Sequence, residues 1–214
     1  MRLWTLLPLL PAFTSFELNN MFGIIQSPGF PNPYGNNLKQ NWNISVPGGF
    51  VIKLYFSYFS LELSYLCEHD YIKIVSDGVE LARLCGQNST DTEDAPSDKR
   101  FYSTSNNMTV TFHTDYSNEN SYPGFVAHYA AEDVDECNLP DHEQPSCDHY
   151  CHNYLGGYHC SCKLGYFLDS DGRNCRESRI RLKGENWTGG VHVGRDCASH
   201  PQAIPLPQQT DSCC

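Results

Sequence analysis

The chain has 214 residues, a net charge of −11 at pH 7 and 11 cysteines, nine of which lie from Cys137 onward. This length allows one ordinary domain plus a small one, and the uneven spread of the cysteines predicts where the two divide. The negative charge argues against nucleic acid or an anionic membrane as a partner, because both would be repelled by this surface. A basic partner or a cation fits better.

The N-terminal segment 1–15 is predicted to be a secretory signal peptide. Met1-Arg2 carries the positive charge, a short apolar run follows, and small residues come next at Thr14 and Ser15. The run is too short to span a bilayer, and no later stretch has the roughly 20 apolar residues of a membrane helix. We therefore expect a secreted, extracellular protein. Four tripeptides are candidate glycosylation acceptors on that route, although such tripeptides also arise by chance: Asn43, Asn88, Asn107 and Asn186.

Short runs of β-branched and aromatic residues, separated by turn residues, fill the segment 16–133. They predict an all-β antiparallel sandwich, and no segment has a helical period. The expected strands are 41–46, 50–59, 71–75, 79–84, 107–113 and 124–130. Within the second strand, alternation predicts one buried face formed by Ile52, Leu54, Phe56 and Tyr58.

Beyond residue 133 the composition changes, and six cysteines lie between Cys137 and Cys175 with few apolar residues around them. The segment 134–176 is therefore predicted to be a small disulfide-rich module, since so short a chain cannot bury a sufficient apolar core. Six cysteines allow 15 connectivities, and spacing alone does not choose among them. The segment 177–214 is predicted to be a divergent flexible tail. Its three cysteines exceed the pairing scheme, so a disulfide and a free thiol are both open for them: Cys197, Cys213 and Cys214.

The motifs SPGFP at 27–31, CEHDYIKI at 67–74 and LCG at 84–86 together resemble the hallmark series of a CUB domain. The motifs DVDEC at 133–137, CHN at 151–153 and YHC at 158–160 resemble a calcium-binding EGF-like module. Their order, together with LELS at 61–64 and a CUB segment with only two cysteines, is similar to the mannan-binding-lectin-associated serine proteases. No trypsin-like domain follows, so the chain resembles that family's short non-catalytic splice product rather than an enzyme.

The resemblance implies two calcium sites, each built from clustered carboxylates and neutral oxygens, as a hard cation requires. For the CUB domain the implied ligands are Glu62, Asp70, Asp115, Ser117 and Asn118; the alternative is ordinary loop acids and turn formers. For the EGF-like module they are Asp133, Val134, Glu136, Asn153, Tyr154 and Gly157; the alternative is an acidic linker before a disulfide knot. The implied disulfides are Cys67–Cys85, Cys137–Cys151, Cys147–Cys160 and Cys162–Cys175.

The same resemblance implies a partner: a lysine on the collagen-like stem of mannan-binding lectin or a ficolin. A lysine ammonium can donate to several carboxylate oxygens at once, and such charge-assisted bonds are about twice as strong as neutral ones. The residues implied to receive it are His69, Asp70, Glu93, Asp115, Tyr116 and Glu119. The alternative for Tyr116 is packing over its loop, and for Glu93 and Glu119 it is solvated surface charge. A calcium-dependent homodimer is also implied.

The sequence is therefore compatible with three functions. The favoured one is a secreted calcium-dependent binding protein that modulates the complement lectin pathway. The others are an N-terminal fragment of a full-length complement serine protease and an extracellular CUB–EGF adhesion protein. Four histidines near the cysteines could suggest a transition-metal cluster: His142, His149, His152 and His159. Disulfide formation in an oxidising compartment favours ordinary loop histidines instead.

Overall fold

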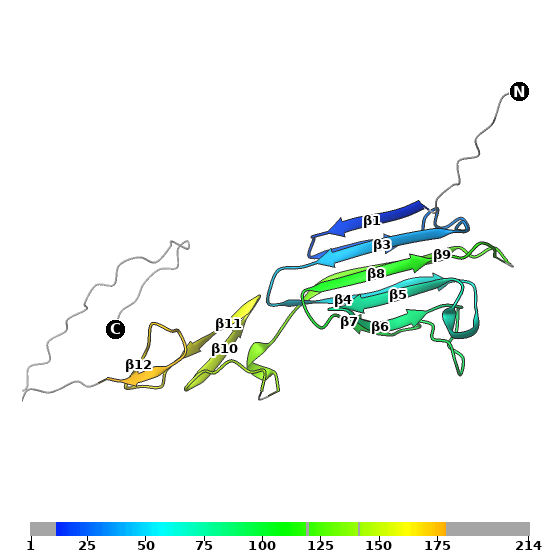
Figure 1. Ribbon diagram of the computed structural model, residues 1–214. Helices are drawn as coiled ribbons and strands as arrows, with labels where there is room; N and C mark the ends of the chain where they lie inside the picture. Colours follow the sequence, from blue (N-terminus) through cyan, green and yellow to red (C-terminus); the bar gives the residue numbers. More distant parts are fainter. Residues whose placement is uncertain (1–11, 119, 141, 179–214) are drawn as a thin grey trace, which may run out of the picture. The chain divides into compact units, whose positions relative to one another are not determined.

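The computed structural model describes residues 12–118, 120–140 and 142–178, which belong to one compact unit. The described residues form β-strands and two short 3-10 helices, so the predicted all-β class is confirmed (Figure 1). In this part of the chain, no helix has the length and apolar character needed to cross a membrane. The chain forms strands here because β-branched and aromatic residues recur with a period of two.

Two sheets form the N-terminal sandwich (Figure 1). The five-stranded sheet has the order β1 (Ala12–Leu18), β3 (Leu38–Ser45), β8 (Asn107–His113), β5 (Tyr71–Ser76) and β6 (Val79–Leu84). The four-stranded sheet has the order β2 (Phe22–Gln26), β9 (Gly124–Asp133), β4 (Phe50–Ser60) and β7 (Arg100–Tyr102). All pairs are antiparallel except β1 with β3, which is parallel. The sequence patterns did not predict β1, β2 or β7.

The core lies between the two sheets and is built from the inward-facing positions of both. Phe112 of β8 and Phe125 of β9 meet edge to face with ring centroids 5.4 Å apart, and Trp42 of β3 contacts Phe125 in the same manner at 5.7 Å. Such edge-to-face pairs add to the stabilisation that burial itself provides. Other fully or nearly fully buried members of the cluster are Ile44, Ile52, Leu54, Ile72, Ile74, Leu84, Val110 and Ala127.

Strand β4 departs from the predicted alternation at one point. Ile52, Leu54 and Phe56 are buried as expected, whereas the prediction for Tyr58 was wrong, since this side chain is 42% exposed. The register with β9 shifts between Phe56 and Tyr58, so Ser57 is an extra residue on β4. A bulge of this kind turns the following side chain to the opposite face, and Tyr58 packs instead on Phe30 outside the core.

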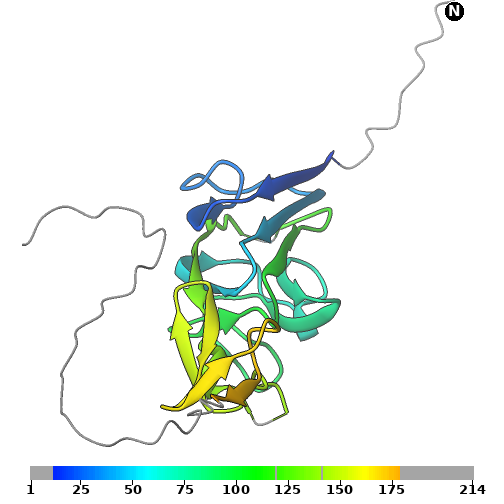
Figure 2. The same cartoon turned by 90° about the vertical axis from the view of Figure 1, so that its left-hand side faces the viewer.

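The C-terminal module consists of a 3-10 helix, η2 (Glu136–Asn138), and two small hairpins, seen in yellow and orange in Figure 2. The first hairpin pairs β10 (Tyr150–Tyr154) with β11 (Gly157–Ser161), and the second pairs β12 (Tyr166–Leu168) with β13 (Cys175–Glu177). Between residues 134 and 178, Cys160 is the only described residue that is buried. Three disulfides replace the missing apolar core: Cys137–Cys151, Cys147–Cys160 and Cys162–Cys175.

The predicted signal peptide and tail fall largely outside the described residues. Of the segment 1–15, residues 12–15 form the start of β1, beside β3; cleavage of a signal peptide stays a prediction. The tail is described only as far as Ser178. The candidate glycosylation site Asn186 and the tail cysteines Cys197, Cys213 and Cys214 also lie outside the described part of the chain.

Candidate metal centres

The first candidate site lies at one end of the sandwich, where three segments meet. Glu62 lies in the loop after β4, Asp70 directly precedes β5, and Asp115 lies in the loop after β8. Strands β5 and β8 are neighbours, with Tyr71 paired to His113, so the register brings Asp70 and Asp115 together. The disulfide Cys67–Cys85, the pairing that the resemblance implied, ties the η1 turn (Tyr65–Cys67) to the end of β6.

Tyr34 connects these segments through its hydroxyl. The hydroxyl donates to Oδ2 of Asp70 at 2.6 Å and accepts from the backbone N–H of Glu62 at 3.1 Å. The other oxygen of Asp70, Oδ1, accepts from the backbone N–H of Asp115 at 2.9 Å. The carboxylate of Asp70 has no exposed surface, so it holds both neighbouring loops from inside. Tyr34 is not among the residues predicted from the sequence, where its one signal is an aromatic residue within a run of turn formers.

The loop after β8 is held by hydrogen bonds to the segment around Asn36. The Asn36 amide Nδ2 donates to the carbonyl of Tyr116 at 3.0 Å, and its Oδ1 accepts from Nδ2 of Asn118 at 2.9 Å. The backbone N–H of Ser117 donates to Oδ1 of Asp115 at 2.9 Å. With its amide nitrogen so engaged, Oδ1 of Asn118 is buried without a hydrogen-bond partner.

This arrangement fits a calcium ion. An unpartnered buried amide oxygen costs free energy of about 1–3 kcal/mol, and calcium takes such oxygens together with carboxylates. Burial raises the pKa of Asp70, against the opposing effect of its hydrogen bonds with Tyr34 and Asp115. The imidazole of His113 also lies near Asp70, and burial lowers the pKa of His113, so it offers little positive charge. A divalent cation would offset the cost of burying the ionised Asp70.

The residues predicted to receive a partner lysine lie in different surroundings. Tyr116 is 78% exposed and His69 has half of its side chain exposed, whereas Glu93 is buried. Hydrogen bonds from the hydroxyls of Thr90 and Thr92 lower the pKa of Glu93, and the backbone N–H of Leu66 donates to its Oε1 at 3.1 Å. Glu93 thus braces its own loop. Glu119 lies outside the described residues.

A second candidate site lies where β9 ends and the C-terminal module begins. The carboxylate of Asp133 accepts from Nδ2 of Asn153 at 3.0 Å and from the backbone N–H of Gly156. Oε2 of Glu136 is buried and has no hydrogen-bond partner. Asp133 and Asn153 are therefore brought together as predicted ligands, and the unpartnered Glu136 oxygen makes this donor set fit a calcium ion. The remaining predicted ligands, Val134, Tyr154 and Gly157, would contribute backbone carbonyls.

The backbones of the two modules approach closely beside this site. The N–H of Val134 donates to the carbonyl of Gly49 at 3.0 Å. Gly49 has φ +84°, and a Cβ built on it would lie 2.4 Å from the carbonyl oxygen of Gly156. Gly156 in turn packs against the ring of Phe50. Only glycine fits at position 49, because a side chain there would need both a strained φ and space that the other backbone occupies.

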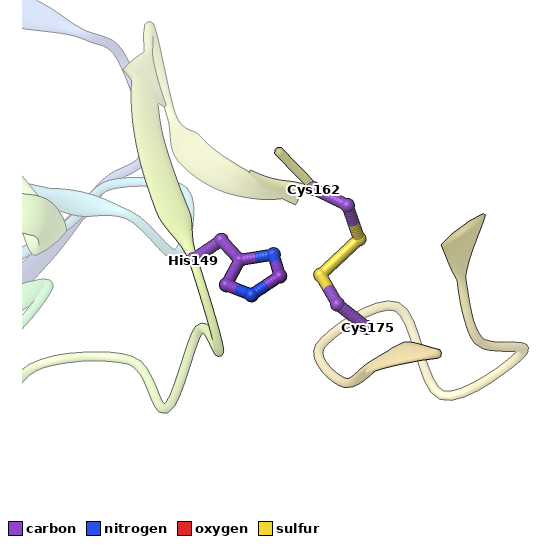
Figure 3. A group of neighbouring side chains, drawn as sticks. All are labelled: His149, Cys162 and Cys175. Carbon is purple, nitrogen blue, oxygen red and sulfur yellow. A yellow bond between two sulfur atoms is a disulfide. The ribbon is translucent and has the colours of Figure 1, made fainter. Parts of the chain in front are cut away.

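The histidines of the C-terminal module do not form a site with the cysteines. His149 faces the sulfur atoms of Cys162 and Cys175 (Figure 3), but these sulfurs are joined in a disulfide and are no longer thiolate ligands. Nδ1 of His149 accepts from the backbone N–H of Lys163 at 3.2 Å. The rings of His152 and His159 stack across β10 and β11 with centroids 4.9 Å apart.

Three of the predicted glycosylation acceptors lie on described residues. Asn88 and Asn107 are exposed, whereas Asn43 is half-buried in β3. The amide of Asn43 donates to Glu17 at 2.6 Å, and its Oδ1 accepts from Thr109 at 3.1 Å. Glycosylation at all of these positions stays a prediction.

Comparison with known proteins decides the family. The sequence model of the CUB domain family matches residues 14–129, and the sequence model of the calcium-binding EGF domain family matches residues 133–175. The chain belongs to the CUB domain family. Both matched regions are non-catalytic modules, and no protease domain is matched in this chain.

Among sequences, the chain is 55% identical over 160 residues to mannan-binding lectin serine protease 1 of Homo sapiens and 54% identical over 170 residues to that of Mus musculus. These alignments cover 75% and 79% of this chain but 23% and 24% of the relatives. The chain therefore spans about a quarter of the length of the curated relatives that it matches.

Among solved structures, the CUB1-EGF-CUB2 domains of rat MASP-1 match with a TM-score of 0.72 at 52% identity, covering 76% of this chain and 59% of that one. The CUB1-EGF-CUB2 domain of human MASP-1/3 matches with a TM-score of 0.68 at 53% identity, covering 74% and 57%. The predicted resemblance to the mannan-binding-lectin-associated serine proteases is thereby confirmed for the CUB and EGF modules.

Proposed function

We propose that this CUB–EGF protein is secreted and binds, in the presence of calcium, a lysine on the collagen-like stems of mannan-binding lectin or ficolins, and so modulates the complement lectin pathway. The observations that carry the proposal are that carboxylate oxygens of Glu62 and Asp115 lie within 4.8 Å of each other, and that the Tyr34 hydroxyl and the buried Asp70 carboxylate hold the backbone of both loops from inside. Calcium bound there would hold the acid oxygens in place, and those facing solvent would remain able to accept from an ammonium group.

The surface around the cluster suits an elongated partner. The exposed ring of Tyr116 stands beside Asp115, and a hollow of about 350 Å³ lined by Leu38, His113 and Thr114 adjoins the same loop. The chain also carries a net charge of −11, which favours a basic stem. A lysine seated on the calcium-ordered acids would thus have apolar surface next to it for the neighbouring residues of the stem.

The similarity to mannan-binding lectin serine protease 1 supports two further parts of the proposal. A homodimer formed through CUB and EGF contacts would give two stem-binding sites per particle, which strengthens attachment to a multivalent stem. Because both matched modules are non-catalytic, such a dimer would occupy stems without itself supplying proteolysis. The second candidate function, an N-terminal part of a longer complement protease, is favoured by the chain covering about a quarter of its relatives.

The test uses the full chain passed over immobilised mannan-binding lectin and over a ficolin, in calcium and then in chelator. We expect calcium-dependent retention that Asp70→Ala and Asp115→Ala abolish while the four described disulfides stay intact. The matched control is Asp98→Ala, an exposed acid that is not among the proposed calcium ligands or lysine-binding residues, which should bind normally. Normal affinity in both cluster variants would refute the assigned site. Retention of neither lectin in calcium would leave an adhesion protein as the better reading.

A further inference from the structure

A ring nitrogen lies beside the carboxylate oxygens at the rim of the sandwich site. One carboxylate oxygen of Glu62, one of Asp115 and one ring nitrogen of His69 all lie within 4.8 Å of one another. Glu62 is buried, Asp115 is half-buried, and the side chain of His69 is 51% exposed. The three side chains come from two different loops, so the fold itself brings them together.

This donor set differs chemically from the one that calcium prefers. Calcium is a hard cation that binds oxygen, whereas imidazole suits zinc, copper and nickel. Two carboxylates and one imidazole, with a fourth position left to water, match the ligand types of open zinc sites. Two ligands that share a tetrahedral zinc lie about 3.4 Å apart at bond lengths of about 2.1 Å. The exposed ring of His69 can close the remaining gap by rotating about its side-chain bonds.

We propose that His69 makes this site a dual one, which binds zinc through Glu62, His69 and Asp115 in competition with calcium. With calcium bound, the oxygens coordinate the ion and His69 stays at the surface. With zinc bound, His69 swings onto the ion and the oxygens of Asp115 are drawn away from the position where a lysine would meet them. Zinc would therefore oppose stem binding; this last consequence rests on the proposed function, whereas zinc binding itself does not.

The stacked rings of His152 and His159 offer imidazole nitrogens elsewhere in the described chain. This pair lacks the third ligand that Glu62, His69 and Asp115 supply to one another. It also already holds a hydrogen bond between Nε2 of His152 and the Ser161 hydroxyl at 2.6 Å. The pair is therefore the matched control, because it offers the same imidazole chemistry in the other module.

The experiment titrates ZnCl₂ and, separately, CaCl₂ into the metal-free full chain by calorimetry. We expect zinc to bind the wild type, and calcium at ten times its own Kd to weaken apparent zinc affinity about elevenfold, the factor 1 + [L]/Kd for one shared site. His69→Gln should weaken zinc binding about tenfold or more, since loss of a residue that merely orients a ligand already costs about 10–100-fold. His69→Gln should change calcium affinity little, and His159→Gln should change the calcium-sensitive zinc affinity little.

Two outcomes would overturn the inference: equal zinc affinity in the wild type and His69→Gln, or zinc binding that saturating calcium does not affect. Because His69 is half-exposed, the variant should fold, and an unchanged circular dichroism spectrum checks this. Calcium binding without zinc binding would remove the inference and leave the proposed function standing. If the chain binds zinc in a calcium-sensitive way but does not bind either lectin, the proposed function fails and the zinc inference stands.

Discussion

The two modules solve the same problem of stability by different means. The sandwich buries Phe112, Phe125 and their neighbours between two sheets and carries one disulfide. The EGF-like module buries only Cys160 among its described residues and carries three disulfides. This difference indicates how each candidate metal site is made rigid. The sandwich site is supported by the packed core behind Tyr34, whereas the junction site is supported by disulfide-closed loops.

The sharpest way to break this comparison is to remove one disulfide from each module. In the double variant Cys162→Ala/Cys175→Ala, the opened loop has a sequence separation of 13, and closing a loop of that size stabilises by about 3 kcal/mol. The C-terminal hairpin has no apolar core to compensate, so we expect β12 and β13 to lose protection in hydrogen exchange. The sandwich strands should keep theirs.

The control is Cys67→Ala/Cys85→Ala, whose sequence separation of 18 gives a similar loop. Because the sandwich retains its core, this variant should stay folded with a lower Tm. Loss of the sandwich with survival of the EGF-like hairpin would contradict the contrast between the modules.

A second change asks whether the sandwich site is held from its core. Tyr34→Phe keeps every proposed calcium ligand and removes only the hydroxyl that joins Asp70 to the N–H of Glu62. We expect calcium affinity at this site to fall about 10–100-fold, the usual cost of losing a group that orients metal ligands. Calorimetry measures it, and Tyr102→Phe on β7, an exposed tyrosine, is the control. Unchanged calcium affinity in Tyr34→Phe would mean that the ion orders the loops without help from the core.

The smallest effect is expected at the junction. Glu136→Gln should weaken the proposed calcium clamp between the modules, so limited proteolysis near residues 133–136 should accelerate several-fold, much as chelator accelerates it in the wild type. Both modules should keep their fold, because their core and disulfides are untouched. Glu143→Gln, an exposed acid of the same module, serves as control. Equal cleavage rates for Glu136→Gln and the wild type in calcium would argue against a clamp.

The sequence predicted the sandwich where burial imposes a simple period. Strands 79–84 and 107–113 were placed at the bounds that the structure has, since each is a short run of strand-forming residues between turn residues. Strand β1 was missed because its parallel partner β3 lies 26 residues further along, and no local pattern records such pairing. Tyr58 was misplaced because a bulge adds a residue through the geometry of two strands rather than through the sequence of one.

The candidate sites show the same division. The acids of both sites could be named from family motifs, and the disulfide scheme Cys137–Cys151, Cys147–Cys160 and Cys162–Cys175 could be implied only in that way. The role of Tyr34 could not be predicted, because its contact with Asp70 joins residues 36 positions apart and depends on the packing of the loops. The internal hydrogen bonding of Glu93 was likewise hidden, since an acidic loop residue has the same appearance in sequence whether it faces solvent or its own backbone.

The close approach of Gly49 and Gly156 has a consequence for protein engineering. Because a side chain at position 49 would clash with the backbone of Gly156, neither module can be exchanged independently of the other. A chimera that joins this EGF-like module to a different sandwich would need a glycine in the corresponding β-turn. Without that glycine, a side chain would push the two backbones apart at the junction. The two modules should therefore be transferred between proteins together, with both glycines retained.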